Sequence, residues 1–317
     1  MLSLLSIIAP VFALIACGYV TRRIGVLGTP AVSELNRFVV YLALPALLFD
    51  VMAHASWAEL AQPRFIAAFG LSCGIIFFAI VAASLIARQP LSTAAINGLL
   101  GSYANTAYIG FPVLLIVFGR ESLVPVTIAS IITVCVLNAS AIVMIEVASQ
   151  SERRPLRLAG KVAVSLAKNP ILIAPVLGVL YGATGLGFPE AADAFLKMLG
   201  GSASPLALVV IGLVLAEPRA VAAAETQLSL ALTAVKLIVH PALTVALATF
   251  FAVPSRLAAM AVVLAALPTG SGPLIVAEFY RLPALVTSAV ILISTLAALL
   301  TLPLVLMGLG FGIGAAP

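Results

Sequence analysis

Charge is the scarcest feature of this sequence. Asp, Glu, Lys and Arg make up 9% of the 317 residues, against roughly 25% in soluble domains, while 63% of the residues are hydrophobic. A water-soluble chain of this length could not bury so much apolar surface. The net charge of +5 does not indicate a nucleic-acid partner, because most positive residues lie in short segments between apolar runs. The composition therefore predicts an integral membrane protein, whose partner is the lipid bilayer and not nucleic acid.

Motifs for metal binding and catalysis are also missing. The three cysteines, Cys17, Cys73 and Cys135, lie far apart inside apolar runs and form no CxxC pair, which favours buried small side chains over a zinc site or a disulfide framework. The HExxH, GxGD and DxxD patterns are absent, and no Ser/His pair has evident catalytic spacing. We expect no metal site, no cofactor and no enzyme activity. An intramembrane enzyme, a channel or a receptor without a recognisable motif is the alternative hypothesis.

Ten apolar runs approach the roughly 20 residues that a spanning helix needs. The first has no positively charged segment before it, so we interpret it as a retained membrane helix rather than a cleaved signal peptide. The predicted spans are Leu2–Val20, Asn36–Ala53, Phe65–Ala87, Thr93–Phe118, Val124–Val147, Pro170–Leu186, Phe195–Ala216, Leu228–Phe250, Leu257–Ala277 and Ala284–Met307. The predicted fold class is an all-α integral membrane protein with ten transmembrane helices.

Lys and Arg are distributed unevenly over the connections between these spans. Eleven of the sixteen lie in or at the ends of odd-numbered connections and four in or at the ends of even-numbered ones, and Lys236 alone falls in the middle of a span. Positively charged loops tend to stay on the cytoplasmic side of a membrane. We therefore predict that both termini face outward.

Landmark residues of the first half recur in the second half at a nearly constant spacing. The matched pairs are Pro10 and Pro170, Gly18 and Gly178, Pro45 and Pro205, Pro112 and Pro273, and Pro125 and Pro283. They predict a first half at 1–147, a cytoplasmic linker at 148–169 and a second half at 170–317. Each half has five spans, an odd number, so the second half enters the membrane from the opposite side. Such an inverted repeat is typical of secondary transporters, because it supplies two near-equivalent states.

Spans four and nine contain sequences that interrupt a helix in mid-membrane. Span four carries SYANTAYIGFP at 102–112, and span nine carries LPTGSGP at 267–273. Pro and Gly remove donors and relax the backbone there. Irregular backbone at this depth is tolerated only when it is buried in protein or lines a wet cavity. We predict two broken helices at a substrate site; a pair of proline kinks that serve packing is the alternative.

The second half-helix at each break presents free N–H groups and a positive dipole end, which favours a small organic anion as substrate. Asn138 on span five either lines the same site or forms hydrogen bonds between helices. The candidate substrate-binding residues are Ser102, Asn105, Thr106, Tyr108, Gly110, Pro112, Asn138, Pro268, Thr269, Gly270, Ser271, Gly272 and Pro273.

Two further polar residues lie in span eight. Lys236 is costly in a bilayer and should face protein or water. It is either a counter-charge or coupling group for the anion, or a lysine that pairs with carbonyls freed at Pro241 or at a helix break. His240, one turn further on, could titrate near neutral pH and is the second candidate for coupling.

Longer motifs resemble one known family. The segments LNRFVVYLALPALLF at 35–49, ANTAYIGFPVL at 104–114, KLIVHPAL at 236–243 and AEFYRLPALVTSAVILISTLAALLTLPLV at 277–305 are similar to the auxin efflux carrier family. That family includes plant PIN-type auxin carriers and bacterial permeases for malonate- or malate-like acids. The similarity spans essentially the whole chain.

The resemblance implies a five-plus-five inverted repeat in which spans four and nine cross at the substrate site. It implies a small carboxylate substrate, a scaffold of spans one, two, six and seven that forms a homodimer, and a mobile domain that moves as an elevator. The short central linker indicates the bacterial type, and hence the bacterial inner (plasma) membrane. PTGSGP stands where bacterial relatives often have an asparagine, so the second break departs from the family pattern. The coupling ion, H⁺ or Na⁺, stays open.

Overall fold

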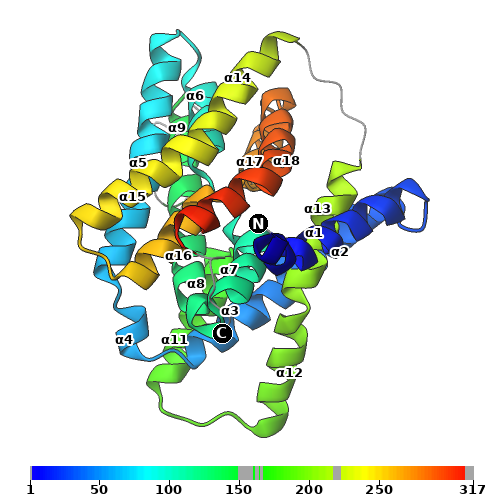
Figure 1. The fold of residues 1–317 in the computed structure, drawn as a ribbon, viewed down its shortest axis with the longest axis vertical. Coiled ribbons are helices and arrows are strands. Elements are labelled where there is room, and N and C mark those ends of the chain that lie inside the picture. The colour runs from blue at the N-terminus through cyan, green and yellow to red at the C-terminus, as the bar shows by residue number, and fades with distance from the viewer. Residues whose placement is uncertain (1, 149–159, 161–163, 165–166, 217–222, 311–317) are drawn as a thin grey trace.

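The computed structural model describes residues 2–148, 160, 164, 167–216 and 223–310. In these ranges the chain consists of helices and short connections (Figure 1). Among the described residues the sole β-type pairing is one antiparallel bridge, between Ala104 and Thr269. The predicted all-α fold is confirmed for this part of the chain. Most of the linker predicted at 148–169 lies outside the described residues.

The helices follow one another with few long connections. In the first half they are α1 (Leu2–Arg23), α2 (Thr29–Phe38), η1 (Val39–Ala43), α3 (Leu44–Ala53), α4 (Trp57–Leu60), α5 (Pro63–Ile86), α6 (Leu91–Ser102), η2 (Thr106–Gly110), α7 (Phe111–Phe118), η3 (Arg120–Ser122), α8 (Leu123–Ile131), η4 (Ile132–Leu137) and α9 (Asn138–Ala148). In the second half they are α11 (Pro170–Ala183), α12 (Glu190–Gly201), α13 (Ala203–Leu215), α14 (Ala223–Ala234), η5 (Val235–Val239), α15 (His240–Phe250), α16 (Ser255–Ala266), α17 (Gly272–Phe279) and α18 (Leu285–Gly308).

Six helical stretches within the described residues are long and apolar enough to cross a membrane. They are Pro30–Ala53, Trp57–Ile86, Arg120–Ala148, Glu190–Leu215, Thr226–Phe250 and Leu285–Gly308. Three shorter apolar helices, Thr106–Phe118, Pro170–Ala183 and Ser255–Ala266, accompany them. Two of these short helices belong to the elements that the sequence predicted to be broken.

Several long helices contain a wider, π-helical turn. Segments η1, η2 and η5 each lead directly into a helix that carries a proline at its first or second position: Pro45 in α3, Pro112 in α7 and Pro241 in α15. Proline has no N–H to donate, so the turn before it can widen without losing a bond at that residue. Such local widening is frequent at functional sites, and η2 immediately follows the first break.

The contacts between helices form two groups; in Figure 1 α1, α12 and α13 lie on one side of the molecule and α5, α6 and α15 on the other. In one group, α1 packs against α13, and α3 packs against α11 and α12; in the other, α5 contacts α6 and α15, and α15 contacts α16. Small residues allow close approach in the first group. A Cβ added to Gly212 of α13 would lie only 1.9 Å from the carbonyl oxygen of Ile15 in α1. Close backbone contact of this kind is the usual way in which helices associate in lipid.

Candidate functional site: two crossing helix breaks

Helices α6 and α16 both stop within the protein interior and restart a few residues later. The chain leaves helix after Ser102 and resumes at Thr106, and it leaves helix after Ala266 and resumes at Gly272. Pro268 cannot donate a backbone hydrogen bond, and Pro112 and Pro273 lie in the first turns of α7 and α17, where proline favours a helix start. The predicted breaks are therefore present.

The two breaks cross each other. The N–H of Asn105 donates to the carbonyl oxygen of Pro268 at 2.9 Å, and the N–H of Gly270 donates to that of Tyr103 at 3.2 Å. These bonds make up the isolated bridge at Ala104 and Thr269. Two segments from different halves of the sequence thus satisfy each other's backbone groups in the interior.

The carbonyl groups freed at the end of each first half-helix have different partners. The Leu100 carbonyl at the end of α6 accepts a hydrogen bond from the Thr269 hydroxyl at 2.8 Å. The Ala265 carbonyl at the end of α16 accepts one from the Lys236 ammonium at 2.5 Å. Lys236 is fully buried, and a cation there complements the negative end of the helix dipole. Of the two interpretations of Lys236, this contact supports the lysine that pairs with carbonyls at a helix break.

Tyr103 explains why the second break is rich in glycine. A Cβ added to Gly272 would lie 2.4 Å from the Tyr103 Cζ atom, and one added to Gly270 would lie 2.9 Å from Cε1. The ring therefore occupies the space that side chains would need at both positions. The Tyr103 ring of the first break therefore packs directly over the backbone of the second break at Gly270 and Gly272.

Two cavities open beside the crossing, with volumes of about 370 and 390 Å³. Asn105, Tyr108 and Ser271 line both. The smaller is also lined by Ser33, Asn36, Glu278 and Thr295, and the larger by Tyr103, Thr106, Asn138, Lys168, Asn169 and Gly272. The first N–H groups of a helix have no partner within that helix, and the starts of η2 and α17 lie at the larger cavity. The crossing thus offers donors to a ligand.

Hydrogen bonds position the polar side chains of the first break. The Tyr108 hydroxyl donates to Asn36 Oδ1 of α2. The hydroxyls of Thr106 and Thr133 lie 3.1 Å apart and share a hydrogen bond. The Oδ1 atom of Asn138 is buried and has no hydrogen-bond partner among the described residues. Asn138 Oδ1 can therefore accept a hydrogen bond from a ligand in the larger cavity.

The remaining predicted residues lie away from these two cavities. The Ser102 hydroxyl donates to the Gly98 carbonyl at 2.8 Å, Gly110 packs against Leu267 and Leu264, and Pro273 is buried within α17. Pro112 lines a separate cavity of about 500 Å³. His240 is fully buried, with Nε2 3.3 Å from the Ser72 hydroxyl and 3.5 Å from Cys73 Sγ. Pro268 and Thr269 contribute backbone and hydroxyl contacts to the crossing itself.

Several polar residues that line these cavities were missed in the sequence, among them Asn36, Tyr103 and Lys168. Asn36 belongs to the LNRF motif at the start of the second predicted span, and a polar residue beside an apolar run was the available signal. Tyr103 lies inside the first break, but it is less polar than its neighbours Ser102 and Asn105, which were predicted instead. Lys168 was counted only as one of the positive residues of the central linker, since nothing in the sequence places it near either break.

A helical membrane protein in which two interrupted helices cross beside polar cavities belongs, by architecture, to the class of membrane transporters. A family model described as "Membrane transport protein" matches residues 3–306, so the chain belongs to that family. Several relatives are transporters by name, and together with the family match they identify this protein as an integral membrane transporter rather than an enzyme.

Three relatives show the breadth of the similarity. The chain is 30% identical to the "Putative malonate transporter" of Rhizobium meliloti (strain 1021) over 307 residues, which cover 95% of this chain and 94% of the relative. It is 24% identical to the uncharacterized transporter YfdV of Escherichia coli (strain K12) over 300 residues, or 93% and 94% of the two chains. The match to auxin efflux carrier component 8 of Arabidopsis thaliana is 28% over 128 residues, or 39% and 35%. The resemblance to the auxin efflux carrier family is confirmed.

Proposed function

We propose that the protein is a secondary carrier or facilitator of small organic anions, such as dicarboxylates or auxin-like carboxylic acids. One observation carries this proposal: the starts of two half-helices meet at cavities whose shared lining includes Asn105, Tyr108 and Ser271. Helix N-termini bind carboxylates through free N–H groups and the positive end of the dipole. A carboxylate can therefore be held there while Lys236 remains engaged with the Ala265 carbonyl.

A dicarboxylate fits the larger cavity better than a monocarboxylate. Lys168 lines this cavity together with Asn105 and Asn138. One carboxylate would bind at the crossing, and the second would face the Lys168 ammonium. The R. meliloti relative is named for malonate, the smallest of such acids with a spacer carbon. We therefore assign Asn105, Thr106, Tyr108, Asn138, Ser271 and Gly272 to the substrate site.

The ten-span inverted repeat belongs to the same proposal, and matching turns support it. Arg88 and Ala252, one in each half of the chain, both have left-handed backbone, with φ of 59° and 47°. They occupy the turn from α5 to α6 and the turn from α15 to α16. The surrounding hydrogen bonds match position for position: Gln89 to Ser84 and Val253 to Ala248, then Ala94 to Pro90 and Ala258 to Pro254.

Helix contacts outside the breaks support the repeat as well. A Cβ on Gly18 of α1 would lie 2.1 Å from the Val209 carbonyl oxygen in α13, and one on Gly178 of α11 would lie 2.6 Å from the Phe49 carbonyl oxygen in α3. The interval in the sequence between the two glycines equals the interval between the two carbonyls. An equivalent pair of contacts with the halves exchanged is what a pseudo-twofold axis produces. We accordingly divide the chain at 1–147, 148–169 and 170–317.

The same repeat provides two alternative states, and we propose alternating access of the elevator type. The group containing α1, α3, α11, α12 and α13 would be the fixed scaffold and the homodimer interface, and the group containing α5, α6, α15 and α16 would move. We further propose that both termini lie outside the bacterial inner membrane, which the uneven distribution of Lys and Arg supports. A reporter enzyme that is active only in the periplasm should therefore show activity when it is fused after Pro317.

Uptake by proteoliposomes tests the proposed function. The purified protein should accumulate radiolabelled malonate or malate more than empty vesicles do, with indole-3-acetate as the monocarboxylate comparison. Lys168→Gln should reduce uptake of the dicarboxylates more than uptake of indole-3-acetate. Repeating the assay with a Na⁺ gradient and with a pH gradient identifies the coupling ion. Failure to bind or move any of the three acids would reject the anion assignment.

A further inference from the structure

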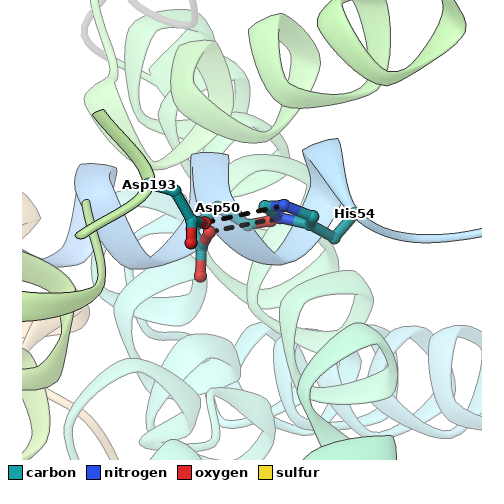
Figure 2. Close-up of side chains that lie close together, drawn as sticks. All are labelled: Asp50, His54 and Asp193. Atoms are coloured by element: carbon teal, nitrogen blue, oxygen red, sulfur yellow. Dashed lines mark hydrogen bonds and ion pairs between the residues drawn. The ribbon is translucent and has the colours of Figure 1, made fainter. Parts of the chain in front are cut away.

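A cluster of charged side chains lies between α3 and α12, away from the crossing. It consists of Asp50 in α3, His54 directly after that helix, and Asp193 in α12. In Figure 2 the two carboxylates reach the histidine ring from separate helices. The sequence suggests no metal ligands here, because Asp193 belongs to the other half of the chain and no ligand spacing joins it to His54. Asp50 is only 7% exposed.

The three side chains converge closely enough to share one ion. One ligand atom from each residue lies within 4.8 Å of the others. His54 Nδ1 is 3.2 Å from Asp50 Oδ1, and Nε2 is 3.7 Å from Asp193 Oδ1. The His54 ring also stacks on Phe188, with centroids 5.0 Å apart, which limits its rotation. The cluster is therefore held in place by packing as well as by charge.

Two carboxylate oxygens in the cluster have unused acceptor capacity. Asp50 Oδ1 and Asp193 Oδ1 are both buried and accept no hydrogen bond within the described residues. The Asp50 carbonyl oxygen lies 2.9 Å from His54 Nδ1 and competes with Asp50 Oδ1 for a proton on that nitrogen. Burying an anionic oxygen without a partner is unfavourable, and a shared cation removes that cost.

The same contact favours the neutral tautomer that leaves the other ring nitrogen free. With Nδ1–H donated to the backbone carbonyl, Nε2 keeps its lone pair and faces Asp193. A histidine that binds a metal usually donates its other ring N–H to a carbonyl or a carboxylate. The second oxygen of Asp193 lies 2.5 Å from the Lys197 ammonium, which leaves Oδ1 available. Asp193 is thus oriented by Lys197 and open toward His54.

We propose that Asp50, His54 and Asp193 form a binding site for one Zn²⁺ ion that joins α3 to α12. Zinc accepts mixed imidazole and carboxylate ligands in a tetrahedron, whereas Mg²⁺ and Ca²⁺ prefer oxygen ligands alone. Tetrahedral zinc holds neighbouring ligand atoms about 3.4 Å apart, given bond lengths of about 2.0–2.2 Å. His54 Nε2 and Asp193 Oδ1, 3.7 Å apart, are close to that spacing, and their side chains, 49% and 25% exposed, have room to rotate. Water completes the coordination.

Zinc titration of the tag-free full-length protein in detergent tests this site. The chain has two histidines, and the other, His240, is buried, so His54 dominates any imidazole signal. Isothermal titration calorimetry should give one Zn²⁺ per chain. His54→Gln and Asp193→Asn should each weaken binding by roughly tenfold or more, and Co²⁺ should produce the visible absorption of a tetrahedral site that His54→Gln abolishes.

Glu190→Gln provides the matched control, because Glu190 begins the same helix outside the cluster and its change should leave zinc affinity unaltered. Size-exclusion profiles identical to that of the wild type establish that the variants are folded; His54 and Asp193 are changed because both are less buried than Asp50. Absence of stoichiometric zinc binding by the wild type, or binding that both variants retain in full, overturns the proposal. The site is independent of the transported substrate.

Discussion

The two helix breaks occupy equivalent places in the halves but contribute different chemistry. The first break, at Tyr103–Asn105, and the π-helical turn after it provide side chains. Asn105 and Tyr108 line both cavities, and Tyr103 packs over the crossing. The second, from Leu267 to Ser271, provides mainly backbone and a capped helix end. The α6 end is held by the neutral hydroxyl of Thr269, whereas the α16 end is held by the Lys236 ammonium.

This difference indicates how a repeated structure can specialise. Both breaks must satisfy their freed backbone groups, since unpaired groups in lipid cost several kcal/mol. In the proposed site the first break would contribute mainly side chains to the ligand, and the second would contribute Ser271 and the start of α17. The absence of an asparagine from PTGSGP, a departure from the family pattern, is consistent with this division, because Gly270 and Gly272 are required beneath Tyr103.

The largest effect is expected where the two breaks touch. Gly272→Leu places a side chain where the Tyr103 ring lies 2.4 Å from a Cβ, and overpacking of this kind costs about 1–3 kcal/mol or more. We expect a lower thermal midpoint in detergent and loss of uptake. Gly201→Ala is the control, because a Cβ at Gly201 has nothing within 4 Å. A Gly272→Leu protein as stable as the wild type would contradict the arrangement of Tyr103.

A second substitution separates recognition from backbone support. Asn105→Ala should reduce transport by roughly 10- to 100-fold, because a hydrogen bond to a charged group contributes about 1.5–3 kcal/mol, and it should leave the thermal midpoint unchanged. Ser271→Ala on the other break should have a smaller effect on uptake. Ser102→Ala is the control, because its hydroxyl bonds to Gly98 outside the cavities. Equal losses from Asn105→Ala and Ser271→Ala would remove the distinction between the breaks.

The third prediction concerns the charged cap. Lys236→Met leaves the Ala265 carbonyl buried and unpaired, which costs about 1–3 kcal/mol, so the thermal midpoint should fall. Lys236→Arg, which keeps a cation, should restore part of it. Reduced uptake at an unchanged midpoint would instead favour Lys236 as the counter-charge for the anion.

Loss of the Thr269 hydroxyl, which is the neutral cap at the end of α6, should have the smallest effect on stability. Thr269→Val removes the hydroxyl that donates to Leu100, at an expected cost of about 0.5–1.5 kcal/mol. Thr244→Val is the matched control, because it removes a hydroxyl that donates to a carbonyl of its own helix at the same 2.8 Å. If Thr269→Val destabilises the protein more than Lys236→Met does, the ranking of the two caps is wrong.

Much of the fold was predictable because composition alone identifies membrane helices. Runs of apolar residues and the Pro and Gly positions at 102–112 and 267–273 identified the helices and both breaks. The close match of Asn105, Thr106, Tyr108, Ser271 and Gly272 to the cavity lining followed from the same pattern. Local sequence sufficed there, since a proline removes a donor wherever it stands.

The partners of those breaks were decided only by tertiary structure. No spacing in the sequence joins Asn36 to Tyr108, Lys236 to Ala265, or Asp50 and His54 to Asp193, because each contact links helices whose relative placement depends on packing across the whole molecule. The sequence by itself determined that the chain is helical, lies in a bilayer and breaks two helices. Which side chains then meet, and which carbonyl a buried lysine neutralises, depended on how close the glycines allow the helices to come.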